Sequence, residues 1–179
     1  MKLGILLTLS FAILTGCEAK DTKQEGKSEN KEEKQQCELV NFKEEDGLYT
    51  CLDTEKSPFD ESGLDISIKK GENGYAKFVI TDKEGKATVD YFDFNYEKNQ
   101  VERYRYVSAM GSAYYYYFDL EKGELEKIEN GDHEDTTEKT KSGGRWDKAA
   151  NTVKDDVQAL EDYFKQEYGK TIKEAVTEK

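Results

Sequence analysis

The chain has 179 residues and a formal net charge of −12, and its charged residues (37%) outnumber its hydrophobic ones (35%). Such a balance is typical of disorder, but an aromatic content of 12% argues for a folded core in part of the chain. The acidic composition disfavours a nucleic-acid partner, because phosphate binding needs clustered Lys and Arg side chains. The negative charge suits a cationic protein partner, or it serves solubility alone. No sequence pattern indicates a cofactor.

The N-terminus has the pattern of a secretory leader. Lys2 precedes the apolar run Leu3–Leu14, which is shorter than the roughly 20 residues of a membrane-spanning helix. The run ends in Leu14-Thr15-Gly16-Cys17. This segment resembles the signal peptide of bacterial lipoproteins, in which the terminal cysteine is acylated and becomes the new N-terminus.

The resemblance implies that residues 1–16 are removed and that lipid on Cys17 anchors the protein to a membrane of the cell envelope. Glu18 stands where an aspartate is linked to inner-membrane retention, so the outer membrane, on its periplasmic or surface side, is the favoured location. The alternatives are an ordinary signal peptide and an uncleaved anchor.

A polar segment follows the leader. Ala19 is the single apolar residue between Glu18 and Gln36, so this segment has nothing to bury. The sequence therefore predicts a disordered, charged tether over residues 17–36 and one folded domain over residues 37–179.

Two cysteines remain for a disulfide, Cys37 and Cys51. Asp46-Gly47 between them is a hairpin signal. We expect a hairpin in which Cys37 faces Cys51 and Leu39 faces Tyr49, held by a structural disulfide. Such a bond, like the leader, indicates an oxidising compartment.

Alternating apolar and polar residues continue to about residue 130, with turn sequences rich in Gly, Asn and Asp between them. The alternating segments are Leu64–Ile68, Ala76–Ile80, Thr88–Tyr96, Val101–Ser108, Ser112–Leu120 and Glu124–Ile128. The pattern predicts a mainly β (α+β) fold, with an antiparallel meander sheet or partly open barrel of about eight strands over residues 37–130.

The C-terminal part has a helical period. Its apolar residues recur at alternating spacings of four and three, at Trp146, Ala150, Val153, Val157, Leu160 and Phe164. We expect a loop over residues 131–144, then one amphipathic helix over residues 145–178 that packs on the sheet, with Trp146 in the core. Gly169 should end the main run of this helix, and Ile172 and Val176 should continue it as a weaker helical tail.

Tyrosines are concentrated in two of the predicted strands. Tyr104 and Tyr106 lie on one, and the run Tyr114–Phe118 lies on the next. Because strand side chains alternate, Tyr115 and Tyr117 should lie on the face opposite Tyr114 and Tyr116. One of these faces must belong to the core, and the other is either a second core layer or a binding surface for a protein or a glycan.

Ser108-Ala-Met-Gly-Ser-Ala-Tyr114 resembles the Ser-Gly-x-x-Tyr loop of the membrane-bound bacterial lysozyme inhibitors, which are small β-barrel lipoproteins. The resemblance implies a protein-binding loop at Ser108 and Ser112, assisted by Lys122. In that family a serine precedes the glycine, whereas here Met110 precedes Gly111.

Catalytic and metal-binding patterns are weak. Asn130–Asp135 gathers oxygen ligands and the single histidine, but it lacks the spacing of a calcium loop or a His-x-x-x-His pair, so we predict a solvated loop and no metal. No Gly-x-Ser-x-Gly motif is present. We expect a non-enzymatic binding or structural role, with protein capture or inhibition through the acidic, tyrosine-rich sheet domain favoured; the alternatives are a binder of glycans or lipophilic ligands and a carboxylate-based hydrolase.

Overall fold

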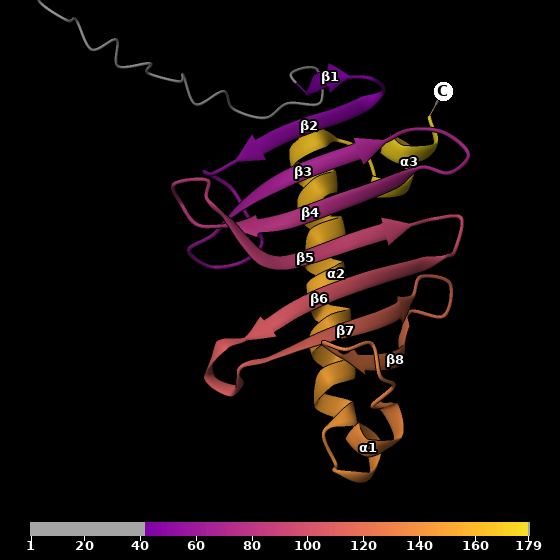
Figure 1. Ribbon diagram of the computed structural model, residues 1–179. Coiled ribbons are helices and arrows are strands. Elements are labelled where there is room, and N and C mark those ends of the chain that lie inside the picture. The colour runs from indigo at the N-terminus through magenta and orange to yellow at the C-terminus, as the bar shows by residue number, and fades with distance from the viewer. Residues whose placement is uncertain (1–41, 179) are drawn as a thin grey trace, which may run out of the picture. The chain divides into compact units, whose positions relative to one another are not determined.

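The sheet is an open antiparallel meander whose eight strands follow one another in chain order (Figure 1). A computed structural model describes residues 42–178, and residues 1–41 and 179 lie outside this range. The strands are β1 (Lys43–Glu45), β2 (Leu48–Asp53), β3 (Gly63–Lys69), β4 (Tyr75–Thr81), β5 (Ala87–Asn95), β6 (Gln100–Val107), β7 (Ser112–Asp119) and β8 (Glu124–Asn130). The predicted mainly β meander is confirmed, and of the two predicted forms it is the open sheet.

The first hairpin has a different register from the one expected. Asp46 and Gly47 both have positive φ angles, 51° and 76°, and they form a two-residue turn that pairs Glu45 with Leu48. Tyr49 therefore pairs with Glu44, and the expected pairing of Tyr49 with Leu39 is wrong. Cys37, like Cys17 and the leader, lies outside the described residues, so its disulfide with Cys51 stays a prediction.

Three helices follow the sheet: α1 (Thr137–Ser142), α2 (Trp146–Tyr168) and α3 (Ile172–Thr177). The segment predicted as a loop, residues 131–144, contains the short helix α1. The apolar periodicity used for prediction could not reveal it, because Thr137–Ser142 contains no apolar residue. The predicted end of the main helix at Gly169 is confirmed, and the predicted weaker tail with Ile172 and Val176 is the separate helix α3. Gly169 ends α2 at a φ of 69°, and a capping box, in which Thr171 and Glu174 each bond the other's backbone N–H, starts α3.

The core lies between α2 and one face of the sheet; in Figure 1 the sheet lies in front of the helix. The predicted apolar stripe is confirmed, since Val153, Val157, Leu160 and Phe164 are buried. Trp146 and Ala150 at its start pack against the core but are only partly buried. The helix meets the aromatic centre of the sheet, where the ring centroids of Phe78 and Phe164 are 5.9 Å apart.

Polar contacts also join α2 to the sheet. The Tyr163 hydroxyl donates to Asp53 Oδ2 (2.7 Å), and Arg103 Nη2 on β6 lies 2.9 Å from Asp156 Oδ2 on the helix. Since α2 and α3 pack on the same side, no helix within residues 42–178 covers the opposite face of the sheet. Among residues 42–178, the search for a helix long and apolar enough to cross a membrane found none.

Candidate binding surface on the open face of the sheet

The run of tyrosines on β7 is divided between the two faces of the sheet. Tyr114 and Tyr116 pack against the core on the helix side. Tyr115 lies on the open face and pairs with Tyr104 on β6, which in turn pairs with Tyr91 on β5. The sequence left open whether these tyrosines belong to the core or to the surface. In the structure, Tyr114 and Tyr116 belong to the core side and Tyr115 to the open face.

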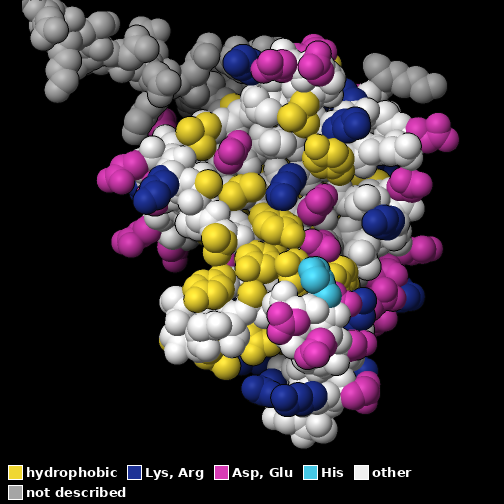
Figure 2. All heavy atoms as spheres, in the orientation of Figure 1, with side chains coloured by type: hydrophobic (Ala, Val, Ile, Leu, Met, Phe, Trp, Pro, Cys, Tyr) yellow, Lys and Arg dark blue, Asp and Glu magenta, His cyan; other side chains and the backbone are white. Residues whose placement is uncertain are grey.

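Tyr91, Tyr104, Tyr115 and His133 form one continuous row, which we name the aromatic band. Its consecutive ring centroids are 5.4, 4.9 and 4.3 Å apart. Figure 2 shows hydrophobic side chains gathered across this face, with the histidine beside them.

The rings of the band are turned toward one another. The ring planes of Tyr91 and Tyr104 are inclined by 14°, and those of Tyr115 and His133 are inclined by 24°. At such short separations nearly parallel rings must overlap face to face in part, because rings lying side by side in one plane would collide. The ammonium of Lys77 lies 4.1 Å from the centre of the Tyr91 ring. Ring faces are therefore largely occupied by neighbouring side chains of this chain.

The phenol groups beside the band are bonded to carboxylates. The Tyr91 hydroxyl donates to Glu102 Oε1 (2.7 Å) and the Tyr117 hydroxyl donates to Glu129 Oε2 (2.8 Å). Burial and these bonds raise the pKa of both phenols, so they stay protonated at neutral pH. Lys127, with its ammonium 2.6 Å from Glu129 Oε1, and the Tyr117 hydroxyl lower the pKa of Glu129, which stays ionised.

Asp93 on β5 and Glu102 on β6 are directly paired across the two strands on this face. We name them the carboxylate pair. Burial, and to a smaller extent Glu102, raise the pKa of Asp93, whereas the charge of Lys77 lowers it. Asp93 Oδ1 is buried and has no hydrogen-bond partner among the described residues. Like charges directly opposite on neighbouring strands destabilise a sheet, so this pair lowers the stability of the isolated protein.

His133 reaches the band from a tight turn after β8. The Asn130 side-chain oxygen accepts bonds from the backbone N–H groups of Asp132 and Glu134, and His133 itself has a positive φ of 61°. A left-handed backbone conformation is uncommon outside glycine. In this conformation the imidazole of His133 stacks on the Tyr115 ring, and its Nδ1 lies 3.3 Å from Glu129 Oε2. In the part of the chain that the structure describes, the search for clusters of three or more metal-ligating side chains found none.

The structure brings only some of the predicted binding residues together. Tyr104, Tyr115 and Tyr117 lie on the open face, and Tyr106, 44% exposed, continues it toward the β6–β7 turn that holds Ser108 and Ser112. Lys122 lies in the turn at the other end of β7 and pairs with Asp119 and Glu126. The eight residues of β7 separate the two turns by about 25 Å, at roughly 3.3 Å per residue. The structure thus does not place Lys122 beside the serine turn.

Five residues of this surface were not predicted: Tyr91, Asp93, Glu102, Glu129 and His133. The strand alternation of Thr88–Tyr96 could have placed Tyr91 and Asp93 on one face. Their pairing with β6 depends on the register, which no single residue of the sequence reveals.

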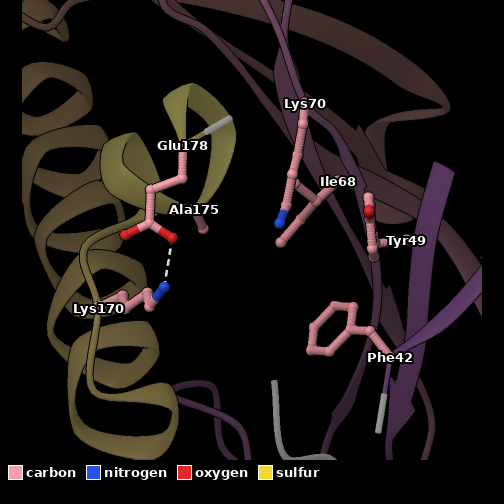
Figure 3. Close-up of a pocket in the computed structure, with 7 residues that line it drawn as sticks. All are labelled: Phe42, Tyr49, Ile68, Lys70, Lys170, Ala175 and Glu178. Carbon is pink, nitrogen blue, oxygen red and sulfur yellow. Dashed lines mark hydrogen bonds and ion pairs between the residues drawn. The ribbon is translucent and has the colours of Figure 1, made fainter. Parts of the chain in front are cut away.

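Two pockets lie away from the aromatic band and the carboxylate pair. A pocket of about 260 Å³ lies between the β1–β2 side of the sheet and α3, where Lys170 and Glu178 form an ion pair (Figure 3). It is lined by Phe42, Tyr49, Ile68, Lys70, Lys170, Ala175 and Glu178. Phe42 is the first residue that the structure describes. A shallow pocket of about 520 Å³ lies between residues 55–61 and α2. The carboxylate pair lines neither of these two pockets.

Comparison of the chain with protein-family models, with curated proteins and with solved structures found no match. The geometry of the open face is therefore the basis for assigning a function.

Proposed function

We propose that the chain is a lipid-anchored protein of the bacterial cell envelope that captures a protein partner, without catalysis, through the aromatic band. The observation that carries the proposal is a row of three tyrosines and a histidine on a sheet face that none of the described helices covers. Tyrosine is enriched at protein interfaces because it offers a large, rigid contact area with a polar tip.

The neighbouring apolar residues support a contact larger than the band itself. Val89 and Met110 are 58% and 59% exposed, and Tyr106 is 44% exposed. Exposed large apolar side chains of this kind are common at interaction sites of soluble domains. These residues extend the proposed surface toward the Ser108–Ser112 turn.

The orientation of the rings favours a protein over a glycan. Sugars bind tyrosine by lying on an open ring face, whereas here Tyr91 is covered by Lys77 and Tyr104, and Tyr117 is covered by the Lys127 ammonium at 4.5 Å. What remains available is ring edges and hydroxyl groups, which suit the side chains of a protein surface.

The anchor and tether rest on the sequence alone. Acylation of Cys17 would hold the domain at a membrane surface, and a tether of 19 residues, Glu18–Gln36, would give it a reach of about 25 Å. A membrane-confined domain with an exposed aromatic face is suited to capture of other envelope or extracellular proteins, and the outer membrane stays the favoured location.

The proposal is tested by affinity capture from envelope extract with the mature protein, followed by quantitative mass spectrometry. Replacing Tyr104 and Tyr115 together by Ser should reduce a specifically retained protein by about tenfold or more, because central aromatic residues dominate interface energy. Tyr75→Ser is the matched control: Tyr75 is also half-buried and on the open face, but it lies at the far end of β4, outside the band. Equal retention by the double variant and the wild type would refute the proposal, and retention of polysaccharide in place of protein would favour the glycan alternative.

A further inference from the structure

The pocket beside α3 lies on the helix side of the sheet, away from the aromatic band (Figure 3). Its walls include the buried side chains of Phe42, Ile68 and Ala175 and the half-buried ring of Tyr49. Ala175 is the smallest of the three buried side chains of α3. The helix therefore leaves a space of about 260 Å³ where this alanine faces the sheet.

The walls of this pocket are held in place by contacts outside it. The backbone N–H of Gly71 donates to the Val176 carbonyl oxygen (3.1 Å), which fixes α3 at the turn between β3 and β4. The ring of Phe42 packs edge-on against the ring of Tyr168, with centroids 5.6 Å apart. The pocket is therefore preformed, as sites for small molecules usually are.

One of the two lysines that line the pocket forms no ion pair among residues 42–178. The Lys70 ammonium lies 4.5 Å from the centre of the Tyr49 ring, whereas Lys170 is neutralised by Glu178. In Figure 3 the Lys70 nitrogen points into the space between the Lys170–Glu178 pair and Phe42. An apolar pocket with one unpaired cation at its edge suits a ligand that has an apolar body and one negative charge.

The volume of the pocket sets the size of this ligand. A cavity of about 150 Å³ holds one benzene molecule, so the present pocket has room for about ten non-hydrogen atoms. We propose that it binds a small carboxylate with a short alkyl chain, in the class of medium-chain fatty acids such as octanoate. The alkyl chain lies against Phe42, Ile68 and Ala175, and the carboxylate accepts hydrogen bonds from the Lys70 ammonium. This inference goes beyond protein capture and does not depend on it.

The test is an NMR titration of the isotope-labelled mature protein with butanoate, octanoate and dodecanoate. Octanoate should shift the amide signals of Ile68 and Ala175, with a dissociation constant on the order of 0.5 mM for a ligand of this size. Each methylene removed should weaken binding about fourfold. Dodecanoate should bind no more tightly than octanoate, because the pocket is then full.

Two results of this titration would overturn the proposal. An affinity that keeps rising from octanoate to dodecanoate would show adsorption to an open apolar surface. Shifts confined to Tyr104 and Tyr115, with none at Ile68 and Ala175, would place the ligand on the other face of the sheet.

Lys70→Gln and Lys69→Gln form a matched pair of variants. Both remove one positive charge from exposed neighbouring positions, but strand alternation places Lys69 on the open face, where it pairs with Tyr75. Lys70→Gln should weaken octanoate binding about fivefold, because a charge-assisted hydrogen bond is lost, whereas Lys69→Gln should change it by less than about twofold. Equal weakening by the two variants would show a general effect of positive charge and would overturn the proposal.

Octanol tests the need for the negative charge. It should bind about fivefold more weakly than octanoate, and Lys70→Gln should leave its affinity unchanged. Equal binding of octanol and octanoate would assign the pocket to a neutral alkyl chain, such as that of a membrane lipid, and would overturn the carboxylate assignment. Octanoate binding that appears only after Leu39 and Val40 are replaced by Ser would show that the chain's own segment occupies the pocket, which would also overturn it.

Discussion

The buried ion pair between Arg103 and Asp156 provides a strong test of how α2 is held on the sheet. The Arg103 side chain is 7% exposed and the Asp156 side chain is 22% exposed. Nη2 of Arg103 lies 2.9 Å from Asp156 Oδ2, yet this oxygen and Arg103 Nε have no hydrogen bond among the described residues. The guanidinium also lies 4.9 Å from the centre of the Phe92 ring.

Burial dominates the energetics of both partners. It lowers the pKa of Arg103 and raises the pKa of Asp156, in each case by more than the opposite charge offsets. The attraction therefore does not repay the loss of solvation, and the pair contributes little net stability. Removing one partner is different, because it leaves the other charge buried and alone.

We predict that Asp156→Ala destabilises the domain by about 3 kcal/mol, the low end for a broken buried pair because Asp156 is partly exposed. This corresponds to a fall in Tm of about 10 °C for a domain of this size. The double variant Arg103→Met, Asp156→Leu should be within about 1 kcal/mol of the wild type or more stable. Urea unfolding followed by the fluorescence of the single tryptophan, Trp146, measures all three. A double variant less stable than Asp156→Ala would refute the reasoning, as would an Asp156→Ala cost below about 1 kcal/mol.

Three further predictions concern other elements. Asp93→Asn should raise the stability at pH 7, because burial raises the pKa of Asp93 in the folded state. As the pH falls through that raised pKa toward 3.8, the wild type should gain more stability than the variant. Equal pH profiles in urea unfolding would contradict the prediction. Tyr163→Phe should cost about 1.5–3 kcal/mol in the same assay, because it removes a buried hydrogen bond to the Asp53 carboxylate. Gly63→Ala should lower the stability by about 1–3 kcal/mol, because its Cβ would lie 2.6 Å from the Asp53 carbonyl oxygen and from Thr81 Oγ1; an unchanged Tm would show that β2 and β4 can shift apart.

The sheet was predictable because its signals are local. Alternation in segments such as Leu64–Ile68 sets the strands, and the short turns between them leave a meander as the simplest topology. The helical stripe through Val153 and Leu160 was equally clear. The first hairpin was misassigned because a cysteine pairing was used to set its register, whereas the two-residue Asp46-Gly47 turn determines it.

The binding surface was only partly predictable because it depends on pairing between strands. Alternation alone separated Tyr115 from Tyr116, but the stacking of Tyr115 on His133 requires the turn after β8. The carboxylate pair requires the β5–β6 register. No spacing along the sequence connects Asp93 with Glu102, so this part of the surface emerges only from the fold.

Site-specific photo-crosslinking in intact cells tests the central claim most directly. A photoreactive phenylalanine analogue in place of the exposed Tyr106, beside the aromatic band, should form a covalent adduct with a protein partner. The same analogue at Lys154, on the exposed side of α2, should not. Adducts at position 154 with none at position 106 would contradict the account, because the partner would then contact the helix and not the open face of the sheet.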